Sequence, residues 1–310
     1  RLGADRIHTG HHLTGLESDE HGATAHFSAG RRGPHLRTVH GPVVIAADGI
    51  HSTARAVRYP DEGMPRWNGS ILWRGTAEVD PVFDGRTMVW AGHPDHKFVG
   101  YPIRDLPDGR QLFNFIAEFR TEGLELAERE DWNQPGVLDD FIGRFEDWTF
   151  DWLDVPALIR SSPGTYRFPM VDRDPVDRWT FGRTTLLGDA AHPMYPIGSN
   201  GASQAILDAR VLVGCLRSHP DDPAAALERY DSIRRPATAA VVMANRGLGP
   251  EMPMKLVEER APGGFTTIDE VITPEEIQQV TEGYRRTAGF ALAELNEGVS
   301  LADREYRDAP

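Results

Sequence analysis

One stretch, GDAAHPMYPIGSNGASQAILDA from Gly188 to Ala209, constrains the fold more than any other part of the chain. The preceding letters RTTLL indicate a short buried strand that ends at Gly188-Asp189. Downstream, apolar residues recur at helical spacing and predict a buried helix: Ala202, Ala205, Ile206, Ala209, Leu212, Val213 and Leu216. A strand that leads through an acidic turn into a helix is typical of an open α/β sheet, where ligands bind beyond the carboxyl ends of the strands.

The approach to this helix favours a particular kind of ligand. Gly198 and Gly201 carry no side chain, so a bulky group can reach the backbone, and the free N–H groups of a helix start attract an anion. Asp189 disfavours a phosphate but accepts hydrogen bonds from hydroxyl groups. A polyol joined to a ring that gains negative charge, such as a flavin, fits both features. Singly, each residue is equally explained by ordinary turn and cap chemistry.

The rest of the chain indicates a second sheet between two α/β segments. Residues 6–28 predict a hairpin, and the apolar run Val43–Ala47 predicts a strand covered on both faces that ends at Asp48-Gly49. Four aromatic-rich segments predict antiparallel strands: 70–79, 87–93, 97–103 and 111–119. An amphipathic helix is expected to bury Leu138, Phe141, Ile142, Phe145 and Trp148. Further helices are expected to begin at Asp222-Pro223 and at Thr273, where Glu276 completes a capping box.

Composition excludes several classes of protein. The net charge of −14 argues against a nucleic-acid partner or an anionic membrane surface. A single cysteine, Cys215, rules out an internal disulfide and favours a cytoplasmic location, and the residue is expected to be inert core. Asp189 and His192 have no third ligand nearby in the sequence, so no metal site is expected.

Two motifs together resemble the flavoprotein aromatic hydroxylases, the family that includes para-hydroxybenzoate and salicylate hydroxylases. The long stretch matches the family's second FAD motif at Gly188, Asp189, Ala190, Ala191, His192, Pro196, Gly198, Gly201, Asp208 and Ala209. The segment DGIHSTAR matches the pattern Asp-Gly-x-x-Ser-x-x-Arg at Asp48, Gly49, Ser52 and Arg55. The amino-acid sequence of the segment HPMYPIGSNGASQAILDA is most similar to the branch that contains salicylate hydroxylase and phenazine-modifying monooxygenases.

The resemblance implies an α/β (α+β overall) fold, with a Rossmann-like FAD-binding domain, an inserted antiparallel β-sheet substrate domain and C-terminal helices. The expected divisions are 1–63 and 166–245 for the FAD-binding domain, 64–165 for the substrate domain and 246–310 for the helical segment. FAD would be the cofactor and NADH or NADPH the electron donor, and O2 and a small aromatic or heteroaromatic substrate would react. A homodimer is compatible with the resemblance.

The resemblance also implies roles for single residues. Asp189 would hold a ribityl hydroxyl, the backbone amides of Gly201, Ala202 and Ser203 would face the flavin pyrimidine edge, and Pro196 would lie against the ring. Asp48, Gly49 and Arg55 would lie near the pyrophosphate, although an isolated surface Arg is a common alternative. Five residues of the aromatic strands are candidates for lining a substrate site or for filling the core: Trp73, Arg74, Trp90, Tyr101 and Phe115. No catalytic side chain is identified.

One departure from the family pattern is the absence of a Gly-x-Gly-x-x-Gly motif, which cradles the pyrophosphate in a first βαβ unit. We therefore expect an N-terminally truncated chain that alone binds FAD poorly and leaves the Val43–Ala47 strand with an unpaired edge. The alternatives to a monooxygenase are an epoxidase or dehydrogenase on the same scaffold, and an inactive fragment that does not hold FAD.

Overall fold

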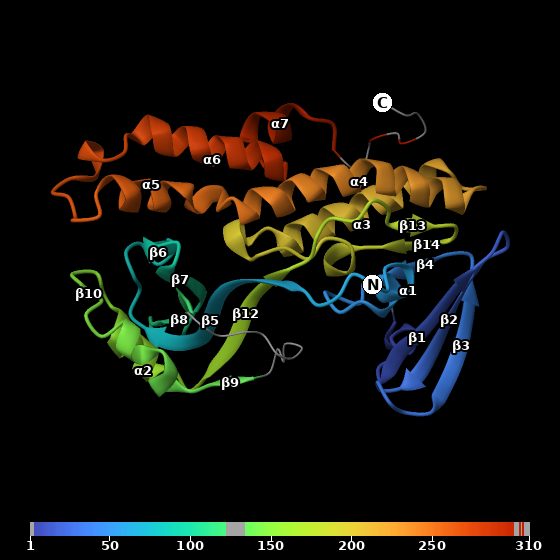
Figure 1. Ribbon diagram of the computed structural model, residues 1–310, viewed down its shortest axis with the longest axis horizontal. Coiled ribbons are helices and arrows are strands. Elements are labelled where there is room, and N and C mark those ends of the chain that lie inside the picture. Colours follow the sequence, from blue (N-terminus) through green and yellow to red (C-terminus); the bar gives the residue numbers. More distant parts are fainter. Residues whose placement is uncertain (1–2, 122–133, 301–303, 305, 307–310) are drawn as a thin grey trace. The chain divides into compact units, whose positions relative to one another are not determined.

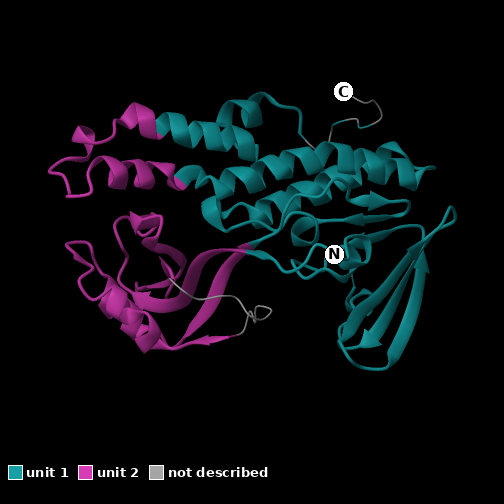
Figure 2. Ribbon diagram, viewed as in Figure 1, with its two compact units in different colours: residues 1–66, 172–250, 278–310 teal, residues 67–171, 251–277 magenta. Residues whose placement is uncertain are grey.

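The computed structural model describes residues 3–121, 134–300, 304 and 306. The chain forms two compact units, coloured separately in Figure 2. Unit 1 contains residues 1–66, 172–250 and 278–310, and unit 2 contains residues 67–171 and 251–277. Both predicted motifs therefore lie in unit 1, and the aromatic strands lie in unit 2.

Unit 1 begins with a three-stranded antiparallel sheet, drawn in blue in Figure 1. Its strands are β1 (His11–Ser18), β2 (Ala23–Ala29) and β3 (His35–Gly41). The hairpin predicted for residues 6–28 is confirmed, and β3 extends it. Leu16 of β1 lies opposite Ala25 of β2, and both are buried. This pair anchors the sheet to the core of unit 1.

A small second sheet of unit 1 carries both predicted motif strands. Its order is β13 (Thr180–Phe181), β14 (Thr184–Leu186) and β4 (Val44–Ala46). β14 runs parallel to β4, with Leu186 opposite Ala46, which confirms the predicted α/β character. β4 is the edge strand of this sheet, as expected. Its Ile45 is 41% exposed, so the expectation that both faces of the strand are covered was wrong at that residue.

Unit 1 also contains helices. They are α1 (Thr53–Arg58), α3 (Gly201–Ser218), α4 (Pro223–Arg246), most of α6 (Pro274–Ala288) and α7 (Leu292–Glu297). Short 3-10 turns are η1 (Ala4–Arg6), η4 (Gly188–Ala190), η5 (Ile197–Ser199) and η6 (Gly249–Glu251). The predicted start of α4 is confirmed, because the Asp222 side chain accepts a hydrogen bond from Ala225 N. Leu212 of α3 and Leu227 of α4 are both buried in this core.

The buried face of α3 differs from the predicted one. Ile206 and Val213, expected inside, are 63% and 54% exposed. The helix instead buries the neighbouring stripe, which consists of Gln204, Asp208, Val211, Leu212 and Cys215. Two of these side chains are polar, and burying them is favourable only because they find hydrogen-bond partners.

Unit 2 is built on a six-stranded sheet of order β6-β7-β8-β5-β12-β9. The strands are β5 (Arg66–Val79), β6 (Val89–His93), β7 (His96–Asp105), β8 (Gln111–Arg120), β9 (Pro135–Gly136) and β12 (Thr165–Asp172). β5 pairs antiparallel with β8, from Ser70 opposite Arg120 to Val79 opposite Gln111. The four predicted aromatic strands are therefore confirmed. One face of the sheet buries Phe98, Phe113 and Phe115 completely.

The helix predicted around residues 138–148 was wrong. That segment forms two 3-10 turns, η2 (Leu138–Asp140) and η3 (Ile142–Arg144). Phe141, with φ −137° between the turns, breaks any continuous helix, and Gly143 is a poor helix former. Phe141 and Phe145 are nevertheless buried, because 3-10 turns bring residues at similar spacing to one side.

The remaining elements of unit 2 are short. They are β10 (Thr149–Phe150), β11 (Leu153–Asp154), α2 (Val155–Ser161), α5 (Met252–Arg260) and η7 (Ile268–Glu270). The capping box predicted at the start of α6 is confirmed: Glu276 N donates to Thr273 Oγ1, and Thr273 N donates to Glu276 Oε2. Helix α5 is not among the helices expected from the sequence.

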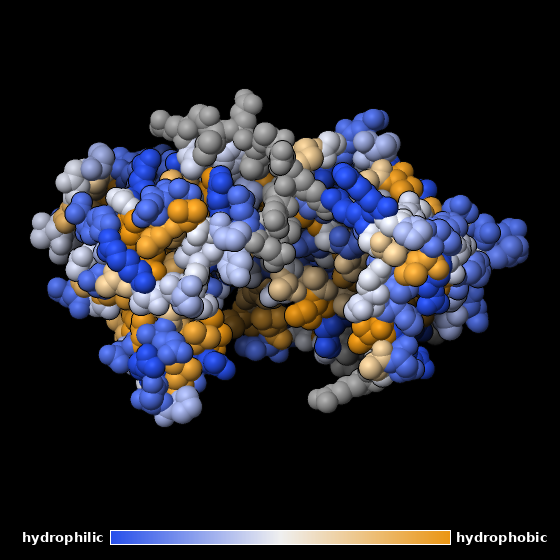
Figure 3. Space-filling view, turned by 90° about the horizontal axis from the view of Figure 1, so that it is seen from below, coloured by the Kyte–Doolittle hydropathy of each residue, from blue (hydrophilic) through white to orange (hydrophobic). Residues whose placement is uncertain are grey.

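The surface of the protein mixes polar and apolar groups. Figure 3 shows hydrophilic residues spread widely over the face in view, with hydrophobic residues scattered between them. Within the part of the chain that the structure describes, no helix combines the length and apolar character needed to cross a membrane.

Candidate functional site

The turn after β14 presents a free carboxylate. Gly188 adopts φ +60°, a left-handed conformation that suits glycine, and this turn places Asp189 at the protein surface. Among the described residues, no side chain or backbone group donates a hydrogen bond to the Asp189 carboxylate. The group is therefore available to accept hydrogen bonds from a ligand.

The same carboxylate faces the start of α3. A Cβ atom built on Gly201 would lie 4.0 Å from Asp189 Oδ1, and no nearer protein atom surrounds that position. The N-terminal residue before the helix, Asn200, makes no side-chain cap. The first backbone N–H groups of α3, at Gly201, Ala202 and Ser203, thus lack the usual side-chain acceptor. Hydrogen-bond donors and an acceptor lie side by side here.

The loop that leads into α3 is tightly wound. Gly198 has φ +72°, and the next residue, Ser199, has φ +53°, which is uncommon for a residue with a side chain. Pro196, at φ −68°, is exposed at the beginning of this loop. Backbone outliers of this kind persist only where surrounding contacts hold them, and they are enriched at functional sites.

A buried polar network lies beneath the Asp189 turn. Asp208 of α3 is fully buried and accepts hydrogen bonds from His192 Nε2 at 2.5 Å, Arg234 Nε at 2.7 Å and Gly188 N at 3.1 Å. Arg234 Nη2 also donates to Gln204 Oε1 at 2.6 Å. Burial alone would raise the pKa of Asp208, but the bonds from His192 and Arg234 outweigh it and lower the pKa. The network ties the turn to α3 and α4.

Asp208 and His192 of this network were identified from the sequence, but Arg234 was not. Asp208 matches the family motif, but helical periodicity alone does not decide whether its side chain is an exposed charge or has a structural role. Arg234 had no motif to mark it, and its partners lie 26 and 30 residues earlier in the chain. A buried arginine on an otherwise ordinary helix is visible only once the packing is known.

The first motif residues serve local structure. Asp48 accepts hydrogen bonds from Ser52 Oγ at 2.5 Å and from Thr53 N at 2.7 Å, so it caps α1. Ser52 Oγ accepts from Arg55 N at 2.9 Å and caps the same helix. Gly49 has φ +79°, which the tight turn between strand and helix requires. The motif therefore fixes the start of α1.

Arg55 joins the two motifs. Its side chain is 1% exposed, which excludes the idle surface arginine considered from the sequence. Nε donates to Glu62, Nη1 donates to Ala191 O at 2.6 Å, and Nη2 donates to Asp174 O at 2.8 Å. Because Ala191 follows Asp189 in the second motif, Arg55 braces the turn that presents the carboxylate.

The substrate candidates of unit 2 divide into core and surface residues. Trp73 is stacked on Phe119 and Phe141, with ring centroids 4.6 and 5.2 Å away, and is buried. Phe115 is completely buried in the same core. Both occupy the core positions that aromatic strand residues commonly take.

The other three candidates reach the surface of unit 2. Trp90 is 40% exposed, Arg74 is exposed and Tyr101 is partly exposed. Arg74 Nη2 lies 3.4 Å from the Tyr101 hydroxyl, and its guanidinium carbon lies 6.0 Å from the Phe168 ring centre. Arg74 and Tyr101 thus form a polar pair beside an aromatic ring.

Unit 2 also buries a charged triad that the sequence did not reveal. Lys97 Nζ lies 2.5 Å from Glu251 Oε2 and 3.2 Å from Glu118 Oε1, and all three side chains are buried. Burial raises the pKa of Glu118 to about 7, although the Lys97 charge opposes the shift. The triad links β7, β8 and the start of α5.

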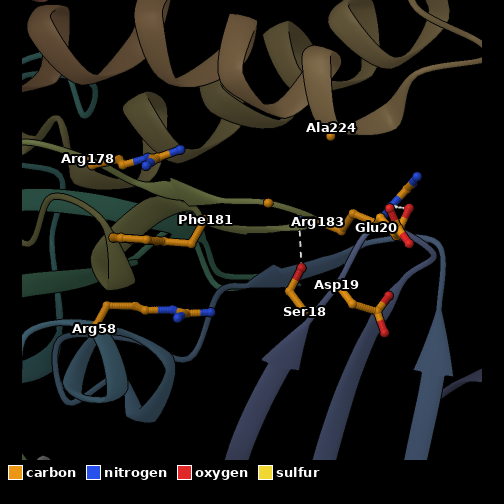
Figure 4. Close-up of a pocket in the computed structure, with 9 residues that line it drawn as sticks. Ser18, Asp19, Glu20, Arg58, Arg178, Phe181, Arg183 and Ala224 are labelled. Carbon is orange, nitrogen blue, oxygen red and sulfur yellow. Dashed lines mark hydrogen bonds between the residues drawn. The ribbon is translucent and has the colours of Figure 1, made fainter.

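A cavity of about 600 Å³ in unit 1 carries several charges (Figure 4). Phe181 lies between Arg58 and Arg178, whose guanidinium carbons are 4.9 and 5.3 Å from its ring centre. Arg178 pairs with Glu228, and Asp19 and Glu20 also line the cavity. Because these charges offset one another, we assign the cavity no ligand. Within the described ranges, no cluster of three or more His, Cys, Asp or Glu could hold a metal ion.

Comparison with known proteins gives a consistent result. The profile of the FAD binding domain family matches residues 1–131 and 155–245, more than half of the chain. Phenazine 1,6-dicarboxylic acid hydroxylase of Lysobacter antibioticus is 41% identical over 249 residues, which cover 79% of this chain and 61% of that protein. 3-Hydroxybenzoate 6-hydroxylase 2 of Aquipseudomonas alcaligenes is 32% identical over 67% of this chain and 62% of its own length. The chain spans less than two thirds of either relative.

A solved structure agrees with these sequence relatives. Klebsiella pneumoniae HpxO, determined with FAD and uric acid, is 26% identical to this chain and superposes with a TM-score of 0.65. The match covers 94% of this chain and 68% of HpxO. This likeness extends the agreement in fold across both compact units.

Proposed function

Because this chain belongs to the family of FAD binding domains, we propose that it acts in an FAD-dependent monooxygenase. The reaction places one oxygen atom of O2 on a small aromatic or heteroaromatic molecule and consumes NADH or NADPH. The observation that carries the proposal is the free Asp189 carboxylate beside the uncapped start of α3. That arrangement offers an acceptor for hydroxyl groups and donors for a carbonyl or anionic edge.

The described residues fit a flavin. Asp189 would accept hydrogen bonds from ribityl hydroxyls, and the N–H groups of Gly201, Ala202 and Ser203 would face the pyrimidine edge. Gly201 leaves room for close backbone approach, since a Cβ there would meet only Asp189 Oδ1 at 4.0 Å. When bound, FAD supplies the redox chemistry that transfers electrons from the nicotinamide donor to oxygen.

The protein's own contribution is binding and charge stabilisation. The N–H groups at the α3 start, together with the positive end of the helix dipole, would stabilise a negatively charged edge of the bound ring. Pro196 is proposed to lie against the ring face, and Gly198 allows the loop to turn beside it. The network of Asp208, His192 and Arg234 and the bonds of Arg55 hold these groups in place.

We assign Asp48 and Gly49 an indirect role. Their hydrogen bonds and backbone conformation fix α1, which carries Arg55, and Arg55 in turn holds Ala191. Arg55 donates hydrogen bonds to oxygens of Glu62, Ala191 and Asp174, so we propose that it positions the cofactor turn rather than binding phosphate. Gly188 contributes by allowing the turn that exposes Asp189.

The substrate class is proposed from the relatives. The two hydroxylases act, by their names, on a phenazine dicarboxylic acid and a hydroxybenzoate, and HpxO was solved with uric acid. All three are planar and carry acidic groups. In unit 2, Arg74 with Tyr101 is a candidate for pairing with such a group, and Trp90 is a candidate for stacking. We also propose a cytoplasmic location, since the single cysteine is free and buried and the electron donor is intracellular.

The test is a substrate screen on the natural full-length protein with FAD. Hydroxybenzoates, phenazine carboxylates and uric acid are tested for their ability to stimulate oxidation of NADH and NADPH. Products formed under ¹⁸O₂ are analysed by mass spectrometry for incorporation of ¹⁸O. A hydroxylated product with one ¹⁸O atom supports the proposal. An oxidised product without ¹⁸O indicates a dehydrogenase, an epoxide indicates an epoxidase, and a protein that never retains FAD refutes the cofactor assignment. Size-exclusion chromatography of the same sample tests for a homodimer.

A further inference from the structure

A tyrosine of α6 lies at the loop that leads into α3. The Tyr284 hydroxyl accepts a hydrogen bond from Asn200 Nδ2 at 2.6 Å and donates to Asn245 Oδ1 at 2.6 Å. It also lies 3.3 Å from Ile197 O. One phenol oxygen therefore joins α6, α4 and the loop before α3. All of these residues belong to unit 1.

Asn245 continues this connection along the loop. Its Nδ2 donates to Tyr195 O at 3.0 Å, and the Asn245 side chain is completely buried. Between them, Asn245 and Tyr284 contact the loop at residues 195, 197 and 200. These contacts explain how the loop keeps two successive left-handed residues, Gly198 and Ser199.

The ring of Tyr284 fits against backbone that has no side chains. A Cβ atom on Gly198 would lie 2.4 Å from the Tyr284 hydroxyl oxygen, and one on Gly249 would lie 2.7 Å from its Cε2 atom. Both glycines also have positive φ. The position of the phenol relative to the loop is therefore fixed by shape as well as by hydrogen bonds.

The contact has a direct consequence for the start of α3. Asparagine is among the best helix N-caps, because its side-chain oxygen accepts a hydrogen bond from the second or third helical N–H group. Asn200 stands at the N-cap position but makes no such bond. Its amide is instead held by Tyr284. With the Asn200 amide nitrogen held in this way, the first N–H groups of α3 have no side-chain acceptor.

We propose that Tyr284 is a positioning residue that holds Asn200 away from the cap and so keeps the N–H groups of Gly201, Ala202 and Ser203 open for the flavin. The proposal rests on the proposed function, because it concerns the same cofactor site. It adds a role for α6, an element outside both sequence motifs. Tyr284 acts through Asn200 and does not touch the reacting atoms.

The test compares Tyr284→Phe with the double variant Asn200→Ala/Tyr284→Phe in the natural full-length protein. Without the hydroxyl, Asn200 is free to cap α3 and competes with FAD. We expect Tyr284→Phe to raise the FAD dissociation constant about tenfold, equivalent to ~1.4 kcal/mol. The double variant lacks the competing amide, and its dissociation constant should return to within about threefold of the wild type. Tyr59→Phe, which removes a hydroxyl bonded to Arg178 O elsewhere in unit 1, is the matched control and should bind FAD normally.

A second measurement needs no cofactor. In FAD-free protein, hydrogen exchange of peptides covering residues 198–206 should be slower in Tyr284→Phe than in the wild type, because a new cap protects the amides. The double variant should exchange as fast as the wild type. The proposal would be overturned if Tyr284→Phe bound FAD as tightly as the wild type. It would also be overturned if the double variant did not regain wild-type FAD affinity, or if residues 198–206 exchanged faster in Tyr284→Phe than in the wild type. If no variant binds FAD, the proposed function fails, while the exchange result still decides the role of Tyr284.

Discussion

Replacing Arg55 with alanine should destabilise unit 1 strongly. The side chain is 1% exposed, and its guanidinium donates to Glu62 and to the carbonyl oxygens of Ala191 and Asp174. Removing one partner of a buried ion pair costs about 3–5 kcal/mol, because the other charge loses its compensation. Arg173 also lies 3.1 Å from Glu62, so Glu62 keeps one partner. We therefore expect a loss at the lower end, about 3 kcal/mol in the free energy of unfolding.

The assay is urea unfolding followed by circular dichroism at the helix band, with the midpoint and slope fitted for each variant. Arg58→Ala, three residues further along the same helix, is the matched control. Its half-buried guanidinium lies 4.9 Å from the centre of the Phe181 ring, and a cation–π contact contributes roughly 0.5–2 kcal/mol. If Arg55→Ala were no less stable than Arg58→Ala, the conclusion that Arg55 braces the cofactor turn would be wrong.

Two further substitutions test the site and the triad. Gly201→Val should fold normally, because a Cβ atom at this position would meet only Asp189 Oδ1 at 4.0 Å. The variant should nevertheless bind less flavin or shift the flavin reduction potential to a more negative value. Normal flavin occupancy and potential would show that α3 does not touch the ring. In Glu118, burial raises the pKa from 4.5 to about 7, so the folded state holds the proton more tightly and stability should fall as pH rises from about 4.5 to 7. Between pH 4.5 and 8, the loss of unfolding free energy should be smaller by roughly 3 kcal/mol in Glu118→Gln than in the wild type, as measured by urea unfolding at both pH values. An equal loss in the two proteins would contradict the assignment.

The parts of the fold that were predicted correctly depend on local sequence. The apolar runs of β4 and β14 end at Asp48-Gly49 and Gly188-Asp189, and the strands do pair in parallel. The caps at Asp222 and Thr273 were also found, because a cap is a bond between residues three positions apart. Interactions between residues this close in the chain can be predicted from the sequence alone.

The errors have a different physical origin. In α3 the apolar stripe with Ile206 and the polar stripe with Asp208 have the same helical period. Only the distant partners His192 and Arg234 make burial of Asp208 favourable, and the sequence does not show that they are adjacent. Periodicity also did not separate a helix from two 3-10 turns, where Phe141 and Phe145 are buried either way.

The candidate site shows the same division. The positions of Asp189 after β14 and of Gly198 and Gly201 before α3 were predicted correctly, since turn chemistry is local. Their contact with a cofactor stays a prediction. The hydrogen bonds from Arg55 to Ala191 and between Tyr284 and Asn200 were not predicted, because each joins residues more than 80 positions apart in the chain. Such contacts become visible only when the elements are packed.

The most direct test of the account is FAD affinity in Asp189→Ala, measured by flavin fluorescence in the natural full-length protein. The carboxylate makes no hydrogen bond to other described residues, so its loss should leave folding intact. Hydrogen bonds to a charged group contribute about 1.5–3 kcal/mol, and we expect binding about 10- to 100-fold weaker. Asp221→Ala, an exposed acid before α4, is the control and should bind as the wild type does. Equal affinity in Asp189→Ala and the wild type would contradict the placement of the flavin at this turn.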